Sequence, residues 1–249
     1  MSITSLFIHL IRKSLKQFDV GITRYSRLEK LNKMIPVAVS AELLGKSKSQ
    51  LRQDLFVLAH VAFKRDGYFV EVGASNGIDL SNTYLMEKEF GWRGILAEPA
   101  ACWQNDLKKN RSSDIESSCV WKESGLTLAF NEVEFAELST INSFSESDSH
   151  GDFRKKGKTY DVSTISLRDL LLKYNAPKQI DYLSIDTEGS EYDILSAFDF
   201  SEYSFEVITC EHNYTPAREK LCALLTENSY QRVFEELSDF DDWYVRRPR

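Results

Sequence analysis

Two apolar segments in the C-terminal half of the chain end in side chains that can bind or transfer protons. These side chains are Asp186 and Glu188 after one segment, and Glu211 and His212 at the end of the next. Because parallel strands present their carboxyl ends at one edge of a sheet, we expect all four to line one pocket as catalytic residues. A single such residue is often a helix cap or a satisfied core group. Four at adjacent strand ends favour a working pocket.

Two kinds of chemistry suit this pocket, and the sequence leaves both open. His212 is a natural general base, because an unperturbed imidazole has a pKa of about 6.5. Asp186 and Glu188 would then orient it or bind acceptor hydroxyls. Alternatively, Asp186, Glu211 and Asn213 offer hard oxygen ligands to a divalent cation.

A second motif, EVGASNG, begins at Glu71 and places glycine where a buried strand turns into a helix. Such a turn lets the backbone approach a ligand at the carboxyl edge of the sheet. The dinucleotide fingerprint requires glycine at positions 73, 75 and 78, and this chain has Gly73, Ser75 and Ile78. The spacing instead favours a cofactor without a pyrophosphate, in which Glu71 faces the amino group of a methionine moiety.

Glu98 ends the next apolar strand and is followed by Pro99. An acidic residue at this place in a Rossmann-like sheet can accept hydrogen bonds from both ribose hydroxyls of a cofactor. A solvent-exposed glutamate at a strand end is the alternative. Together with the glycine turn, Glu98 predicts a nucleoside-containing ligand.

The elements that position these residues alternate between strands and helices, which predicts a mostly parallel α/β sheet. Apolar periodicity indicates helices over 50–63, 81–90, 167–174, 191–198 and 216–228. It indicates strands over 68–73, 93–99, 115–121, 161–166, 180–186, 205–212, 231–237 and 242–247. We expect a seven-stranded sheet that closes with an antiparallel hairpin at its C-terminal edge.

The stretch between these two blocks is less regular. We expect a local hairpin of 126–130 with 133–138, followed by a loop over 139–159, which contains few apolar residues. A polar stretch near 46–49 divides the chain into a helical N-terminal extension, 1–49, and a catalytic domain, 50–249.

Composition narrows the class of protein and of partner. The net charge of −7 argues against a surface that follows phosphate backbones, so we expect no nucleic-acid substrate. The four cysteines have no zinc-like or paired spacing, which favours a reducing compartment, and we assign the cytoplasm. Residues 1–34 carry seven basic side chains against two acidic ones, so a helix packed on the domain or a peripheral membrane contact is expected there.

The chain resembles the FkbM-type methyltransferases in 70–99, 180–195, 208–214 and 240–245, which together span most of 50–249. The resemblance implies a Rossmann-like class I methyltransferase fold and S-adenosylmethionine as methyl donor. By position it implies that Glu71, Gly73, Ala74, Asn76 and Gly77 contact the methionine part, Glu98 the ribose, and the region of Trp121 the adenine.

The expected function is therefore methylation of a hydroxyl oxygen on a sugar, glycan or natural-product acceptor. Two alternatives are an NAD-binding protein, which the glycine spacing disfavours, and a non-catalytic protein that retains only the fold. The motifs do not identify the acceptor.

Overall fold

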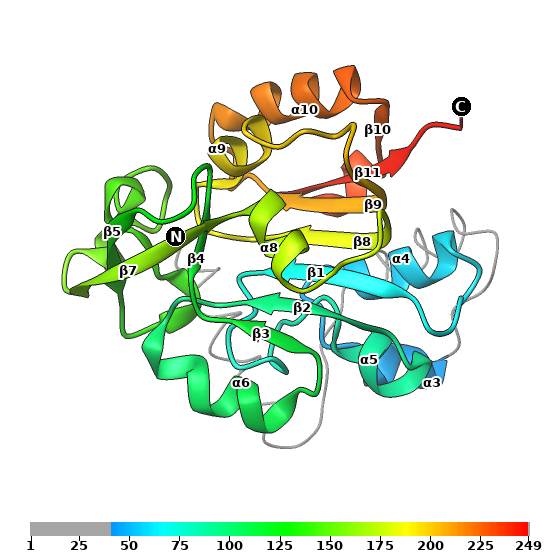
Figure 1. Ribbon diagram of the computed structural model, residues 1–249, viewed down its shortest axis with the longest axis horizontal. Helices are drawn as coiled ribbons and strands as arrows, with labels where there is room; N and C mark the ends of the chain where they lie inside the picture. Colours follow the sequence, from blue (N-terminus) through cyan, green and yellow to red (C-terminus); the bar gives the residue numbers. More distant parts are fainter. Residues whose placement is uncertain (1–40, 249) are drawn as a thin grey trace.

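The computed structural model describes residues 41–248, which are built around a seven-stranded sheet (Figure 1). The strand order is β10-β11-β9-β8-β1-β2-β3, and every pairing is parallel except those of β11 with β9 and β10. The seven-stranded, mostly parallel sheet with an antiparallel C-terminal edge is thereby confirmed. Its strands are β1 (Tyr68–Val72), β2 (Arg93–Ala97), β3 (Asp114–Glu116), β8 (Gln179–Ile185), β9 (Ser204–Glu211), β10 (Tyr230–Val233) and β11 (Asp241–Arg246).

Helices cover both faces of this sheet, because its central strands are apolar on both sides. One face packs against α8 (Leu167–Lys173), α9 (Glu191–Ser196) and α10 (Ala217–Glu227). The other packs against α4 (Gln53–His60), α5 (Tyr84–Phe90), α6 (Gln104–Asn110) and the short α11 (Glu235–Ser238). The result is a three-layer sandwich with a separate hydrophobic core on each face of the sheet.

A smaller sheet lies beyond the carboxyl ends of the central strands (Figure 1). Its order is β4-β7-β5-β6, with β4 (Cys119–Trp121), β5 (Thr127–Glu132), β6 (Thr140–Ile141) and β7 (Lys158–Ser166). The short helices η2 (Ala136–Leu138), η3 (Asn142–Phe144) and α7 (Gly151–Arg154) connect these strands, whereas η1 (Ala101–Trp103) follows β2. Tyr160 on β7 accepts a hydrogen bond from Ala101 N, so the smaller sheet contacts the loop after β2.

Three predictions in this region were wrong. The strand expected over 115–121 is two strands in different sheets, β3 and β4. The expected local hairpin does not form, since β5 pairs with β7 and β6, and 136–138 is a 3-10 helix. The region expected to be a loop, 139–159, contains β6, η3, α7 and the start of β7. The long-range pairing is favoured because it buries Phe130, Ile141 and Val162 in one core.

The predicted N-terminal extension lies mostly outside the described residues, and so does the basic segment 1–34. Its last residues contact the domain: α3 (Ala41–Lys46) forms an ion pair between Lys46 Nζ and Glu89 Oε2 at 2.9 Å, and Ser49 Oγ donates to Asn82 Oδ1 at 2.6 Å. None of the helices within 41–248 is long and apolar enough to span a bilayer. The domain boundary at residue 49 remains a prediction.

Candidate active site

The glycine turn after β1 brings three central strands into close contact. Gly73 N and Ala74 N both donate to Ala97 O at the end of β2, at 2.9 and 3.2 Å. Gly73 has φ +88°, and a Cβ atom on it would lie 1.9 Å from Asp186 O, directly after β8. This position therefore requires glycine for both its conformation and its space. The turn lies at the carboxyl edge of the sheet, as predicted for cofactor binding.

The side chains of this turn are used to shape it. Glu71 is buried and accepts hydrogen bonds from Ser81 Oγ at 3.0 Å, Asn82 N at 2.7 Å and Thr83 Oγ1. Asn76 Oδ1 accepts from the backbone N–H groups that follow it, Ile78 N and Asp79 N, both at 2.9 Å. These contacts fix the path from β1 into α5. Within the described residues, Glu71 and Asn76 therefore hold the backbone of the turn in place.

The turn has a direct prediction. Changing Gly73 to Ala should lower the free energy of unfolding by about 1–3 kcal/mol more than changing Gly125 to Ala, because forced overpacking costs about that much. Gly125 is the matched control, since its φ is also positive (+79°) but a Cβ atom added to it would have no atom within 4 Å. Urea denaturation of both variants measures the difference. Equal losses of unfolding free energy in the two variants would show that the backbone moves away from Asp186 O without a measurable loss of stability.

Glu98, directly after β2, contacts this turn through Ser75. It is 5% exposed, and its two oxygens accept hydrogen bonds from Ser75 N at 2.8 Å and Ala100 N at 2.7 Å. Burial raises the pKa of Glu98 to about 7. Each carboxylate oxygen keeps a lone pair for a further donor, because an ionised carboxylate has about four acceptor sites. Glu98 therefore has the chemistry expected of a ribose ligand.

Two buried polar atoms in the segment that follows Glu98 lack protein partners among the described residues. They are Trp103 Nε1, a donor, and Gln104 Oε1, an acceptor, and the Gln104 amide nitrogen donates to the Glu98 carbonyl. Buried polar atoms without partners are rare and call for a ligand or water. Trp121, expected near the adenine, is buried in the core of the smaller sheet and packs edge-to-face on Phe144 at 5.9 Å.

The structure brings together three of the four predicted catalytic residues. One carboxyl oxygen each from Asp186, Glu188 and Glu211 lies within 4.8 Å of the other two. Burial, and then the neighbouring negative charges, raise the pKa values of Asp186 and Glu211 well above their usual range. Glu211 Oε2 is buried with no hydrogen-bond partner within the described chain. Like charges this close cannot all remain ionised without a compensating cation or shared protons.

Glu188 also belongs to a second group of side chains, which the sequence analysis missed except for Asn213. Its Oε2 accepts from Arg154 Nη2 at 2.7 Å and from Asn213 Nδ2 at 3.2 Å, and it lies 3.4 Å from His150 Nδ1. The guanidinium of Arg154 also holds both oxygens of Asp148, at 2.9 and 3.1 Å. The smaller sheet joins this site through Thr140 Oγ1, which donates to Glu188 O.

His212 is placed differently from the three carboxyl groups. Its Nδ1 accepts a hydrogen bond from Tyr214 N at 3.0 Å, so the proton is on Nε2, which lies 3.7 Å from Asp242 Oδ1. Asp242 pairs with Arg218 of α10, on the opposite face of the sheet from α4. Burial lowers the pKa of His212. Its Nδ1 is thus occupied, whereas the buried Nε2 lies beside Asp242 and has no hydrogen-bond partner among the described residues.

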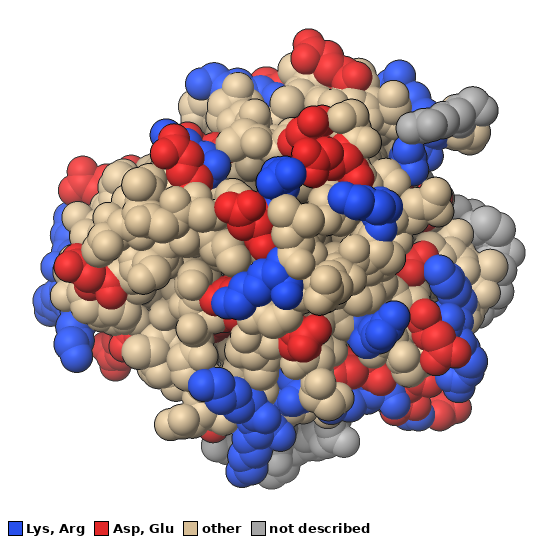
Figure 2. Space-filling view, in the orientation of Figure 1, with Lys and Arg blue, Asp and Glu red and all other residues tan. Residues whose placement is uncertain are grey.

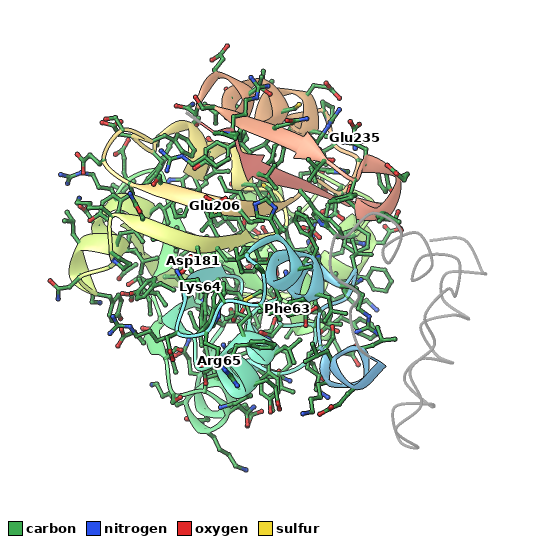
Figure 3. The ribbon with its side chains drawn as sticks, turned by 90° about the vertical axis from the view of Figure 1, so that its right-hand side faces the viewer. Phe63, Lys64, Arg65, Asp181, Glu206 and Glu235 are labelled. Atoms are coloured by element: carbon green, nitrogen blue, oxygen red, sulfur yellow. The ribbon has the colours of Figure 1, made fainter. Side chains whose placement is uncertain are left out.

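Two cavities are found within the described residues. One of about 320 Å³ is polar and is lined by Arg154 together with Asn131, Asn142 and Thr159, beside the group around Glu188. The other, about 410 Å³, lies at the amino ends of β8 and β9. There Lys64 pairs with Asp181 at 2.7 Å beside Glu206, as Figure 3 shows. Only the first of these two cavities is connected to the predicted site, through Arg154, which donates to Glu188.

The sheet order, the antiparallel β11 and the glycine turn at the carboxyl edge define a class I methyltransferase fold. The family model described as the methyltransferase FkbM domain matches residues 71–244. The chain therefore belongs to the FkbM methyltransferase family, whose members use S-adenosylmethionine as methyl donor.

The chain is also similar to several solved structures, at low sequence identity. An FkbM methyltransferase from Methylobacillus flagellatus is 12% identical, with a TM-score of 0.45, and the match covers 88% of this chain and 58% of that chain. A precorrin-6y methyltransferase from Geobacter metallireducens is 10% identical, with a TM-score of 0.41 and coverage of 77% and 85%. A putative RNA methyltransferase from Pyrococcus horikoshii is 10% identical, with a TM-score of 0.38 and coverage of 90% and 99%. No curated protein sequence gives a significant match.

Proposed function

We propose that this protein transfers a methyl group from S-adenosylmethionine to a hydroxyl oxygen of a sugar, glycan or natural-product acceptor. One observation carries the choice of a polar acceptor: a polar cavity is lined by Arg154, which donates to Glu188, one of the three carboxyl residues gathered at the ends of β8 and β9. Carboxylates, amides and hydroxyls are the groups that bind polyhydroxylated ligands through hydrogen bonds. Family membership supports the methyl donor.

The residues around Glu98 fit this donor. Its ribose hydroxyls would donate to the free lone pairs of the Glu98 carboxylate, and the unpartnered Gln104 Oε1 and Trp103 Nε1 offer an acceptor and a donor in the segment that follows Glu98. When bound, the donor supplies a methyl group already activated by a sulfonium. The protein then has to position the acceptor oxygen in line and remove its proton. Positioning alone is worth about 7–11 kcal/mol.

The test combines binding with turnover. Calorimetric titration with S-adenosylmethionine, S-adenosylhomocysteine and NAD should show binding of the first two only. Incubation with donor labelled in its methyl group and a panel of methyl glycosides should then give a labelled O-methyl product by mass spectrometry. Binding of NAD alone would favour the dinucleotide alternative, and binding without transfer to any acceptor would favour a non-catalytic protein.

We propose that transfer proceeds without a divalent cation, which gives a prediction on metal removal. The Arg154 guanidinium, 2.7 Å from Glu188 Oε2, already supplies positive charge here and would repel a nearby cation. Asp186 and Glu211, with raised pKa values, can share a proton instead. Methyl transfer should therefore be unchanged in excess EDTA. A loss of activity that Mg²⁺ restores would instead assign a cation to Asp186, Glu211 and Asn213.

The remaining proposals concern partners and location. On the face seen in Figure 2, basic and acidic side chains are interspersed, which supports the proposal that nucleic acid is not the acceptor. We retain the cytoplasm as the proposed location. Peripheral membrane contact through residues 1–34 is tested by flotation with anionic liposomes, which should be lost in a protein lacking 1–34.

A further inference from the structure

His150 has a defined place at the carboxyl edge of the sheet, between η3 and α7. Its side chain is 21% exposed, with Nδ1 at 3.4 Å from Glu188 Oε2 and 3.8 Å from Asp148 Oδ1. Both of these neighbours are carboxylate oxygens, which only accept hydrogen bonds when ionised. The proton of the neutral ring therefore belongs on Nδ1. This leaves the lone pair on Nε2 for a ligand.

The carboxylate behind His150 is held rigidly. Arg154, which is 2% exposed, donates to Glu188 Oε2 at 2.7 Å, and Asn213 donates to the same atom at 3.2 Å. His150 N donates to Asp148 Oδ1 at 2.7 Å, and Asp148 is held in turn by Arg154. A histidine whose second nitrogen donates to a fixed carboxylate has its tautomer and ring orientation set, as in catalytic dyads and triads.

The pair formed by His150 and Glu188 is linked to the glycine turn through the end of β8. A Cβ atom on Gly73 would meet Asp186 O, and Glu188 lies two residues beyond that carbonyl. The other histidines within 41–248 are excluded by their positions. The lone pair of His212 Nδ1 accepts from Tyr214 N, so the proton is on the buried Nε2, which then has no lone pair for a substrate proton. His60 pairs with Glu206 at the opposite end of the sheet.

We propose that His150, oriented by Glu188, is the general base that deprotonates the acceptor hydroxyl, an inference that rests on the proposed function. The hydroxyl proton moves to His150 Nε2. A lone pair of the acceptor oxygen forms the new bond to the methyl carbon. The carbon–sulfur bond breaks with its electron pair left on sulfur, giving a neutral thioether and an imidazolium paired with Glu188. The mechanism thus uses an imidazole at this edge, as the sequence predicted, but a different one.

The charges around the ring set its expected pH dependence. The hydrogen bond to Glu188 raises the pKa of His150, as does the charge of Asp148, whereas Arg154 opposes this rise. A base must be unprotonated to act, so the rate should increase with pH through a value above the ordinary 6.5 of histidine. The rate should then reach a plateau.

The experiment compares His150→Gln with the matched control His60→Gln in the full-length protein. His60 also faces a glutamate, Glu206, but at the amino ends of the strands. At saturating S-adenosylmethionine, His150→Gln should lower methyl transfer to methyl glycosides about 10²–10⁴-fold and abolish the rise of rate with pH. Its affinity for S-adenosylhomocysteine should stay within about threefold, and His60→Gln should leave both quantities unchanged. Equal rates for the two variants would overturn the proposal.

A second measurement does not depend on the acceptor. ¹⁵N NMR of histidine-labelled protein, with His150 assigned by the variant, should show the Nδ1–H tautomer with an unprotonated Nε2 at high pH. An Nε2–H tautomer would overturn the proposal, whatever the activity. A wild-type protein that binds S-adenosylhomocysteine but methylates no glycoside would contradict the acceptor class of the proposed function, and the tautomer would then still decide the state of His150.

Discussion

Replacing Glu98 with Ala should weaken S-adenosylhomocysteine binding by at least about 100-fold, as measured by calorimetry. Hydrogen bonds to a charged group are worth about 1.5–3 kcal/mol each, and two ribose hydroxyls lose their acceptor together. The carboxylate also accepts hydrogen bonds from Ser75 N and Ala100 N, so its loss should loosen the loops after β1 and β2, where we propose that the ribose binds. Glu98→Gln keeps the shape of the side chain and should lose less.

Glu116→Gln is the control, because Glu116 ends the neighbouring strand β3 and also accepts a backbone hydrogen bond, from Ser118 N. Its other oxygen is taken by Lys173 Nζ at 2.6 Å. This variant should keep its affinity for S-adenosylhomocysteine. An unchanged affinity in a folded Glu98→Ala protein would remove Glu98 from the cofactor site.

The same group gives the binding a pH dependence with a definite sign. Burial raises the pKa of Glu98 to about 7, so in the free protein it is largely protonated below pH 7 and ionised above it. Ribose hydroxyls bind the ionised form better, and affinity should therefore rise as the pH passes upward through 7. One pH unit below the pKa, about one molecule in ten is ionised, so affinity at pH 6 should be roughly tenfold below its plateau. Glu98→Gln should flatten this dependence.

The sequence predicted the main sheet because its strands carry strong local signals. Runs such as 68–73 and 180–186 are apolar on both faces, as expected for parallel strands covered by helices, and each ends at a glycine or an acidic residue. Glu98 and the glycine turn were identified for the same reason. Their places are set by the strand that precedes them, and that strand is visible in the sequence.

The smaller sheet could not be predicted in this way. Its strand β5 pairs with β7, about thirty residues later, and neither strand alternates cleanly between buried and exposed positions. Local patterns therefore favoured a neighbouring segment as the partner of β5. Arg154 and His150 lie in the stretch that looks like a loop, rich in Ser, Asp and Gly. Only the tertiary pairing brings them to Glu188, and no local signal marks them.

His212 shows why the sequence could not predict which side chains share a pocket. The sequence places it at the end of a strand, directly after Glu211. Successive side chains of a strand point to opposite faces, so two adjacent residues cannot both enter one pocket unless the backbone turns. Glu211 lies with Asp186 and Glu188, whereas His212 lies beside Asp242 and Arg218. The structure thus keeps three of the four predicted residues together, Asp186, Glu188 and Glu211. The histidine that contacts them is His150, which the sequence did not indicate.

Arg154→Met should lower the free energy of unfolding by about 3–5 kcal/mol, measured by urea denaturation, and should also abolish methyl transfer. Arg154 is fully buried and pairs with two carboxylates, those of Asp148 and Glu188, so its removal leaves buried charge without compensation. Arg154→Lys should recover only part of the loss, because an ammonium group cannot reproduce the planar fork that holds both oxygens of Asp148.

Two further variants test whether uncompensated charge causes the loss of stability in Arg154→Met. Arg168→Met removes an arginine from the exposed pair with Glu202 and should leave unfolding unchanged, since exposed pairs are solvated. Adding Glu188→Gln to Arg154→Met removes one of the two stranded charges and should restore part of the lost stability, a coupling that a double-mutant cycle measures. Strict additivity of the two substitutions would contradict this account. Arg154 would then stabilise the loop through packing and its bond to Leu138 O, and the placement of Glu188 behind His150 would need another cause.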